Sequence, residues 1–86
     1  MKNTKYTTWT IQACGDEREW LTMWIGDDRV AKIDTPHDFT PHTWGLNAAA
    51  VHAIIDPILA THGYKPSSAI NYDCVIDLAS GGAVAV

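Results

Sequence analysis

Residues 19–25 read Glu-Trp-Leu-Thr-Met-Trp-Ile, and this short stretch decides most of what can be expected of the fold. Two sets of side chains alternate along it: Leu21, Met23 and Ile25 in one set, and Trp20, Thr22 and Trp24 in the other. Successive side chains of a strand point to opposite faces, so this alternation predicts a β-strand with two chemically different faces. We assign the Leu-Met-Ile set to the core side of a sheet, which places both tryptophans on its other side.

The segments on either side of this stretch predict two more strands. Residues 7–13 alternate an apolar set with a polar set: Trp9, Ile11 and Ala13 against Thr8, Thr10 and Gln12. The polar run at 15–18 joins them to residues 19–25 as a hairpin. Gly26, Asp27 and Asp28 form a second turn signal, and residues 29–33 follow as a short third strand. Three consecutive strands predict an antiparallel meander.

From residue 47 onward the apolar period becomes helical. The spacing i, i+3, i+4, i+7, i+8 is met by Val51, Ile54, Ile55, Ile58 and Leu59. Asn47 is expected to cap this helix, Gly63 to end it, and Pro57 to kink it. Residues 69–78 alternate again and predict a last strand, with its core side formed by Ile70, Tyr72, Cys74, Ile76 and Leu78.

Together these elements predict an α+β fold with two layers, an antiparallel sheet in the order β-β-β-α-β and one helix packed on one face. With 86 residues, the chain has room for one small domain spanning 1–86. Residues 1–5 and 80–86 are expected to fray, the latter unless an edge strand captures them. Between them, 34–45 is a loop in which Thr-Pro-His-x-aromatic occurs twice, interpreted as two successive turns.

Composition and charge exclude several classes of protein. A hydrophobic content of 47% with four Trp argues against disorder, and no apolar run approaches the length of a membrane span. Six basic against ten acidic residues give a net charge of −4, which disfavours direct binding to nucleic acid or membranes. No apolar segment follows the first residues, so we expect no signal peptide and a cytoplasmic location.

Residue types that carry chemistry are present but lack the expected spacing. Cys14 and Cys74 are sixty residues apart with no Cys-x-x-Cys, so neither a zinc site nor a disulfide is expected. The best metal candidates are the loop residues His37, Asp38 and His42, which are more typical of turns.

A catalytic base would have to come from His52 with Asp56 at i, i+4, and its nucleophile from Cys74 or Ser68. A surface pair is the simpler interpretation of His52 and Asp56. A chain this short also has little room for both a substrate pocket and a core. We therefore expect no enzyme activity, no cofactor and no metal.

The sheet face that a single helix cannot cover is the most informative prediction. It would present two tryptophans rimmed by threonines and carboxylates, which is the usual anatomy of an interface. The candidate partner-binding residues are Trp20, Thr22, Trp24, Thr8, Thr10, Asp73 and Asp77. Two alternatives stay open: the loop at 34–45 or the tail at 80–86 covers this face, or the tryptophan set points inward.

These features favour a non-enzymatic, small acidic inhibitor that binds a larger protein or protein complex. By analogy of size and composition, we expect a phage-type anti-defence protein, similar to anti-CRISPR proteins, that blocks a larger nuclease complex. An antitoxin or immunity module is the first alternative. The layout hairpin, strand, helix, strand over residues 6–60 is similar to HicB-like antitoxins, but their DNA-binding tail has no counterpart here. A homodimeric structural subunit is the second alternative.

Overall fold

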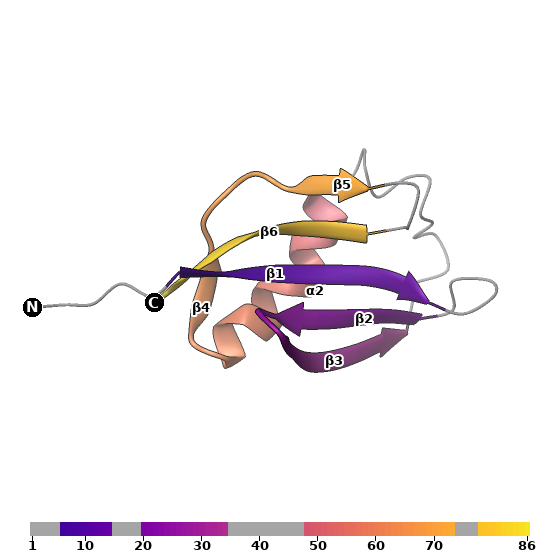
Figure 1. Ribbon diagram of the computed structural model, residues 1–86, viewed down its shortest axis with the longest axis horizontal. Helices are drawn as coiled ribbons and strands as arrows, with labels where there is room; N and C mark the ends of the chain where they lie inside the picture. The colour runs from indigo at the N-terminus through magenta and orange to yellow at the C-terminus, as the bar shows by residue number, and fades with distance from the viewer. Residues whose placement is uncertain (1–5, 15–19, 35–47, 74–77) are drawn as a thin grey trace, which may run out of the picture.

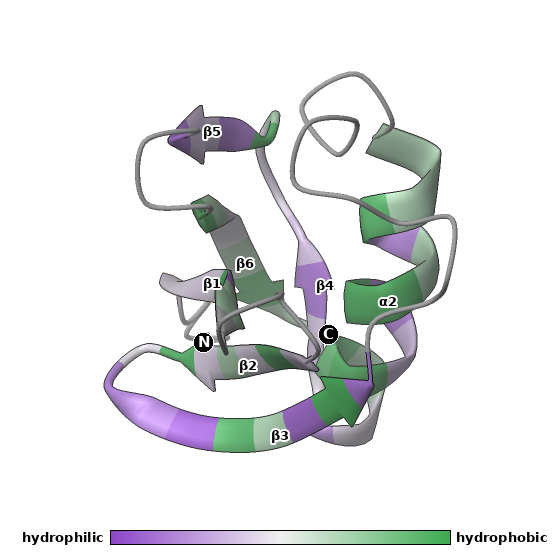
Figure 2. Cartoon of the chain, turned by 90° about the vertical axis from the view of Figure 1, so that its right-hand side faces the viewer, coloured by the Kyte–Doolittle hydropathy of each residue, from purple (hydrophilic) through white to green (hydrophobic). Residues whose placement is uncertain are grey.

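The computed structural model describes residues 6–14, 20–34, 48–73 and 78–86 (Figure 1). Within these ranges the helix is α2 (Ala48–Thr61), and the strands are β1 (Tyr6–Cys14), β2 (Trp20–Ile25), β3 (Asp28–Asp34), β4 (Tyr64–Pro66), β5 (Asn71–Asp73) and β6 (Leu78–Ala85). They pair antiparallel in the order β3-β2-β1-β6-β4, with β5 on the other half of the same edge of β6. The sheet curls into a half-barrel around α2 (Figure 2), so the mixed α+β class is confirmed.

The first three strands lie where the alternation predicts them. In β1 and β2 the partners Ile11 and Met23 are both fully buried, whereas Thr10 and Trp24 project to the opposite face. Gly26, with φ of 60°, lies in the turn between β2 and β3, and its N–H donates to the Thr8 carbonyl at 2.7 Å. Only a glycine adopts this left-handed backbone without strain, which explains the Gly-Asp turn signal.

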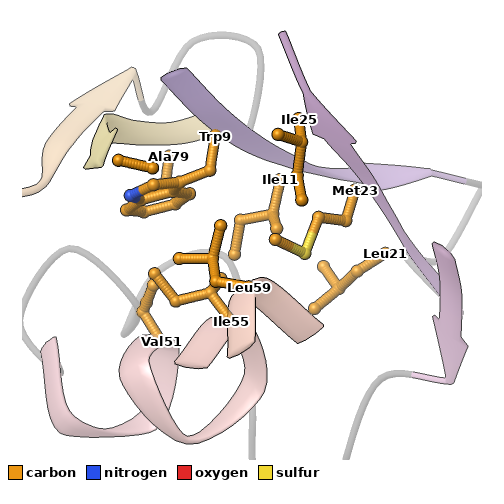
Figure 3. Close-up of a cluster of buried hydrophobic side chains, with 10 residues drawn as sticks. Trp9, Ile11, Leu21, Met23, Ile25, Val51, Ile55, Leu59 and Ala79 are labelled. Carbon is orange, nitrogen blue, oxygen red and sulfur yellow. The ribbon is translucent and has the colours of Figure 1, made fainter. Parts of the chain in front are cut away.

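Helix α2 packs its apolar stripe into the concave side of the sheet. Val51, Ile55 and Leu59 are fully buried, and Ile54 and Ile58 are partly buried against the same core. Figure 3 shows Val51, Ile55 and Leu59 facing the core side chains of β1, β2 and β6. The helix ends as predicted, because Gly63 has φ of 83° and its N–H bonds to the Ala60 carbonyl at 3.0 Å. Asn47 lies outside the described residues.

Pro57 lies inside α2 on its exposed side. Its ring has no N–H to donate to the carbonyl of Ala53, so the helix lacks one internal hydrogen bond. We expect Pro57→Ala to raise the free energy of unfolding by about 1–3 kcal/mol, because the bond is restored and no buried contact is lost. Urea denaturation followed by circular dichroism measures this change. A lower midpoint with an unchanged m-value would show that the proline shapes the packing of α2 instead.

The carboxyl-terminal part of the sheet differs from the prediction: in the described ranges the element order is β-β-β-α-β-β-β, not β-β-β-α-β. Strand β5 covers only part of the predicted last strand, and residues 74–77 lie outside the described part of the chain. The segment expected to fray, 80–86, lies mostly in β6, between β1 and the β4–β5 edge. Leu78, expected to face the core, pairs with Gln12 on the opposite face.

The prediction for 80–86 is wrong because β6 needs small residues where it packs against the large indole of Trp9. Ala79, Gly81 and Ala83 lie on the core side of β6, and Gly81 pairs with Trp9. An ideal Cβ on Gly81 would lie 2.9 Å from the Trp9 ring, so the indole occupies the space that a side chain would fill. The small residues of β6 have low strand propensity, but they are the ones that leave space for this indole.

Strand β4 replaces the polar connection expected after the helix. Tyr64, Lys65 and Pro66 pair with the last residues of β6, and the N–H of Ser67 continues the contact to the Gly82 carbonyl at 3.0 Å. Both short strands, β4 and β5, thus pair with β6 and complete the half-barrel on that side.

Candidate functional site

The sheet has an outer face on the side away from α2. Cross-strand partners project to the same face, so the register of the strand pairs defines it. Starting from Thr10, which pairs with both Trp24 and Ser80, the described residues of the outer face include Thr8, Thr10, Gln12, Trp20, Thr22, Trp24, Arg29, Lys32, Asp34, Asn71, Asp73, Leu78 and Ser80. In the described part of the chain, the helix packs on the inner side of the curl (Figure 2).

The two tryptophans of β2 lie on this outer face. Leu21 and Met23 are fully buried in the core and Ile25 is 9% exposed, so the inward assignment of that set is confirmed and the swapped assignment is wrong. Trp20 and Trp24 are each half-buried, and Thr22 between them is only 7% exposed. Their indoles are thus partly accessible at two positions along one strand.

Two basic side chains lie beside these indoles, which the sequence did not predict, and the exposed Asp34 is the cross-strand partner of Trp20. The Lys32 ammonium lies 4.7 Å from the centre of the Trp20 ring, a cation–π geometry. Arg29 is the cross-strand partner of Trp24. The register shifts between Met23 and Trp24, and this bulge puts Arg29 and Lys32 on the same face although three positions separate them.

A hollow of about 530 Å³ lies beside these side chains, and we call it the β2–β3 hollow. Its described lining is Trp20, Thr22, Arg29, Val30, Ala31 and Lys32. Two of these residues are basic and none is acidic. Asp34 pairs with Trp20 at the end of β3 but does not line the hollow. The hollow therefore combines the Trp20 indole with two positive charges.

The predicted site residues are only partly brought together. Thr10 pairs with Trp24, and Thr8 lies further along β1 toward the Gly26 turn. Asp73 shares the outer face, but it lies on β5, which β1 and β6 separate from β2 in the curled sheet. Asp77 lies outside the described residues. The structure thus places Thr8 and Thr10 in the strand next to the tryptophans, and the predicted carboxylate Asp73 at the other end of the sheet.

The candidate catalytic pair is formed on the exposed side of α2. His52 Nδ1 lies 3.1 Å from Asp56 Oδ1, and the two side chains are 37% and 49% exposed. The Ser68 hydroxyl interacts with backbone: it accepts the Gly82 N–H at 2.8 Å and donates to the Ala69 carbonyl at 3.1 Å. Cys74 lies outside the described residues.

The metal candidates and Cys74, one of the two cysteines, lie outside the described residues. His37, Asp38 and His42 fall outside the described residues, with both copies of the short repeat. Among the side chains that the structure does describe, no three His, Cys, Asp or Glu are grouped closely enough to hold a metal ion. Within those same ranges, no helix has the length and apolar character needed to cross a membrane.

Comparisons with known proteins leave the outer face to be interpreted from its own chemistry. The chain matches no protein-family model, and no curated protein or solved structure is significantly similar to it.

Two features could have revealed the basic side chains from sequence: the short turn at Gly26, which fixes β3 beside β2, and the charged positions of residues 28–34. Alternation alone does not show that these basic side chains share a face, because the bulge interrupts the alternation between them.

Proposed function

We propose that this protein is a non-enzymatic inhibitor that binds a larger protein or protein complex through the outer face of β2 and β3. The observation that carries the proposal is the pair Trp20 and Trp24, half-buried on the face away from α2 beside two basic side chains. In its specific form the proposal is a phage-type anti-defence protein that acts in the cytoplasm and blocks a nuclease complex, as anti-CRISPR proteins do.

The side-chain chemistry of this face supports a protein partner. Trp and Arg are the residues most often found at energetic hot spots of interfaces, where each fills or borders a small pocket. Here Trp20 borders the β2–β3 hollow and Arg29 lines it. Half-burial holds each indole against the sheet, so that binding costs little side-chain entropy. The surface is therefore suited to receiving side chains from another protein.

The titratable pair of α2 supports an inhibitor over an enzyme. His52 and Asp56 lie on the exposed side of the helix, whereas the β2–β3 hollow is lined by residues of two strands of the sheet. An exposed pair at i, i+4 on a helix contributes a few tenths of a kcal/mol and is common on helix surfaces. We infer that the outer face acts by occupying a partner's surface and not by chemistry.

The test is an affinity capture from host lysate with wild-type protein, Trp20→Ala/Trp24→Ala and Tyr6→Ala. Tyr6 is an aromatic residue of the same sheet that is 75% exposed and outside the β2–β3 hollow, so it is a matched control. We expect one large partner with nuclease activity to be retained by wild type and Tyr6→Ala. The double variant should lose binding by at least about a hundredfold, since two hot-spot indoles are removed. Adding purified wild-type protein should suppress the nuclease.

Other outcomes assign the protein to a different class. Capture of a small toxic protein would favour the antitoxin alternative, and a concentration-dependent dimer that the double variant abolishes would favour a structural subunit. Retention of the partner by the folded double variant would show that the tryptophans are not the binding site. Thermal denaturation of each variant separates these outcomes from loss of the fold.

A further inference from the structure

The β2–β3 hollow carries a charge opposite to that of the whole protein. The chain has a net charge of −4, yet the described residues that line the hollow include Arg29 and Lys32 and no carboxylate. Asp34, at the end of the same strand, is the nearest acidic residue on the outer face by register. Basic side chains gathered at one hollow of an acidic protein indicate a local preference for anionic groups.

The side chains of Lys32 and Arg29 differ in how strongly neighbouring residues restrain them. The Lys32 ammonium lies 4.7 Å from the centre of the Trp20 ring, which restrains a side chain that is otherwise mobile. Arg29 is exposed and lies across from Trp24, so its guanidinium can reach a ligand in the hollow. A guanidinium binds a carboxylate through two parallel hydrogen bonds, and an ammonium adds a point charge. Val30 and Ala31 also line the hollow, and both pack against the core.

We propose that the β2–β3 hollow receives an acidic segment of the partner protein, in which carboxylates alternate with apolar side chains. The carboxylates pair with Arg29 and Lys32, and the apolar side chains contact the accessible part of Trp20. This assignment rests on the proposed function and adds the chemistry of the partner's contact segment.

Two other occupants fit the charges less well. A nucleic acid would bring a line of phosphates past Asp27, Asp28 and Asp34, which lie in the same hairpin and repel it. A second copy pairing along β3 would meet a strand with a bulge beside it and with charged residues along its edge, which disfavours strand addition. An acidic segment that brings only a few carboxylates to Arg29 and Lys32 meets less of this repulsion than a continuous line of phosphates, and it requires no pairing along β3.

The experiment titrates isotope-labelled protein with three probes and follows backbone amides and indole N–H signals by NMR. The probes are a blocked ten-residue peptide alternating Glu and Val, the same peptide with Lys in place of Glu, and a ten-residue oligothymidylate. We expect the Glu peptide alone to shift the amides of 29–32 and the indole signal of Trp20 in a saturable way. Raising the salt concentration from 0.05 to about 0.5 M should weaken this binding by about tenfold.

Charge variants test whether the hollow itself is responsible. Lys32→Glu should weaken binding of the Glu peptide by at least about tenfold, because an attractive charge becomes repulsive. Lys65→Glu is the matched control, since it changes the net charge equally from an exposed position of β4 outside the hollow. Lys32→Arg should retain binding.

Each contrary result overturns the proposal in a recognisable way. Absence of saturable shifts with the Glu peptide would show that the hollow does not receive acidic segments. An equal loss with Lys65→Glu would show an effect of net charge alone, and equal binding of the oligothymidylate would show a general anion surface. None of these results depends on the lysate capture. A tryptophan-dependent partner without peptide binding would leave the proposed function standing and remove only its acidic segment.

Discussion

A chain that stops after Asp77 is expected not to fold. Strand β6 pairs with β1 from Tyr6–Val84 to Gln12–Leu78, and its other edge holds both β4 and β5. Without it, β4 and β5 lose the strand that they pair with. The fully buried indole of Trp9 also loses Gly81, the residue that it packs against. A domain of this size has a net stability of about 5–10 kcal/mol, which is less than the loss of a central strand.

The measurement is far-UV circular dichroism with urea titration, and the control is removal of Val86 alone. Val86 is 83% exposed, and its N–H donates one hydrogen bond to the Gly63 carbonyl at 2.9 Å. Losing it should cost about 1 kcal/mol or less. A cooperative urea transition in the chain that ends at Asp77 would contradict the central position of β6.

The amino-terminal half of the fold could be predicted because its signals are local. Strand β2 contains large β-forming residues in strict alternation, and Gly26 has the positive φ that its turn requires. In α2 the apolar stripe repeats with helical spacing, and Gly63 ends it. In each case the residues that form the periodic pattern and the glycine that ends the element are close together in the sequence. No distant contact is therefore needed to predict the element.

The carboxyl-terminal strand could not be predicted because its role depends on a distant residue. Gly and Ala are depleted in strands, and they make up five of the seven residues at 79–85. What makes these residues suitable is the indole of Trp9, which belongs to the first strand of the chain. Sequence periodicity contains no information about which side chain will lie across from a glycine.

The candidate site shows the same division. The outward direction of Trp20 and Trp24 followed from their own strand, and the structure confirms the buried set that opposes them. The basic partners Arg29 and Lys32 depend on the register between β2 and β3, where the bulge changes the alternation. Asp73 was placed beside the tryptophans because the last strand had no predicted neighbour, and pairing through β6 puts it two strands beyond β1.

Gly81→Ala is expected to destabilise the protein by about 2–3 kcal/mol, although alanine has the better intrinsic propensity. Among the described glycines, positive φ is found at Gly26 and Gly63, so backbone strain is not the reason. At an unstrained position the change would stabilise by about 0.4–1 kcal/mol through the unfolded chain. Here the new Cβ would lie 2.9 Å from two atoms of the Trp9 ring and 3.0 Å from a third.

The Trp9 ring cannot move aside without disturbing its neighbours, because Trp9 is fully buried in the cluster of Figure 3. Gly82→Ala is the matched control in the next residue: its Cβ would approach the hydroxyls of Ser67 and Ser68 at 2.8 and 3.2 Å. The closer hydroxyl belongs to Ser67, which is exposed and can rotate away, and the hydrogen-bonded Ser68 hydroxyl has to shift by only a few tenths of an ångström, so this change should cost less than about 1 kcal/mol.

Thermal denaturation of the two variants makes the comparison. We expect the melting temperature of Gly81→Ala to fall by about 10–20 °C, and that of Gly82→Ala by only a few degrees. Trp9→Phe provides a second check, since the smaller ring frees part of the space above Gly81. The combination Gly81→Ala/Trp9→Phe should be more stable than the sum of the single effects. Additive losses would mean that the indole does not lie over Gly81, and the small residues of β6 would then need another explanation.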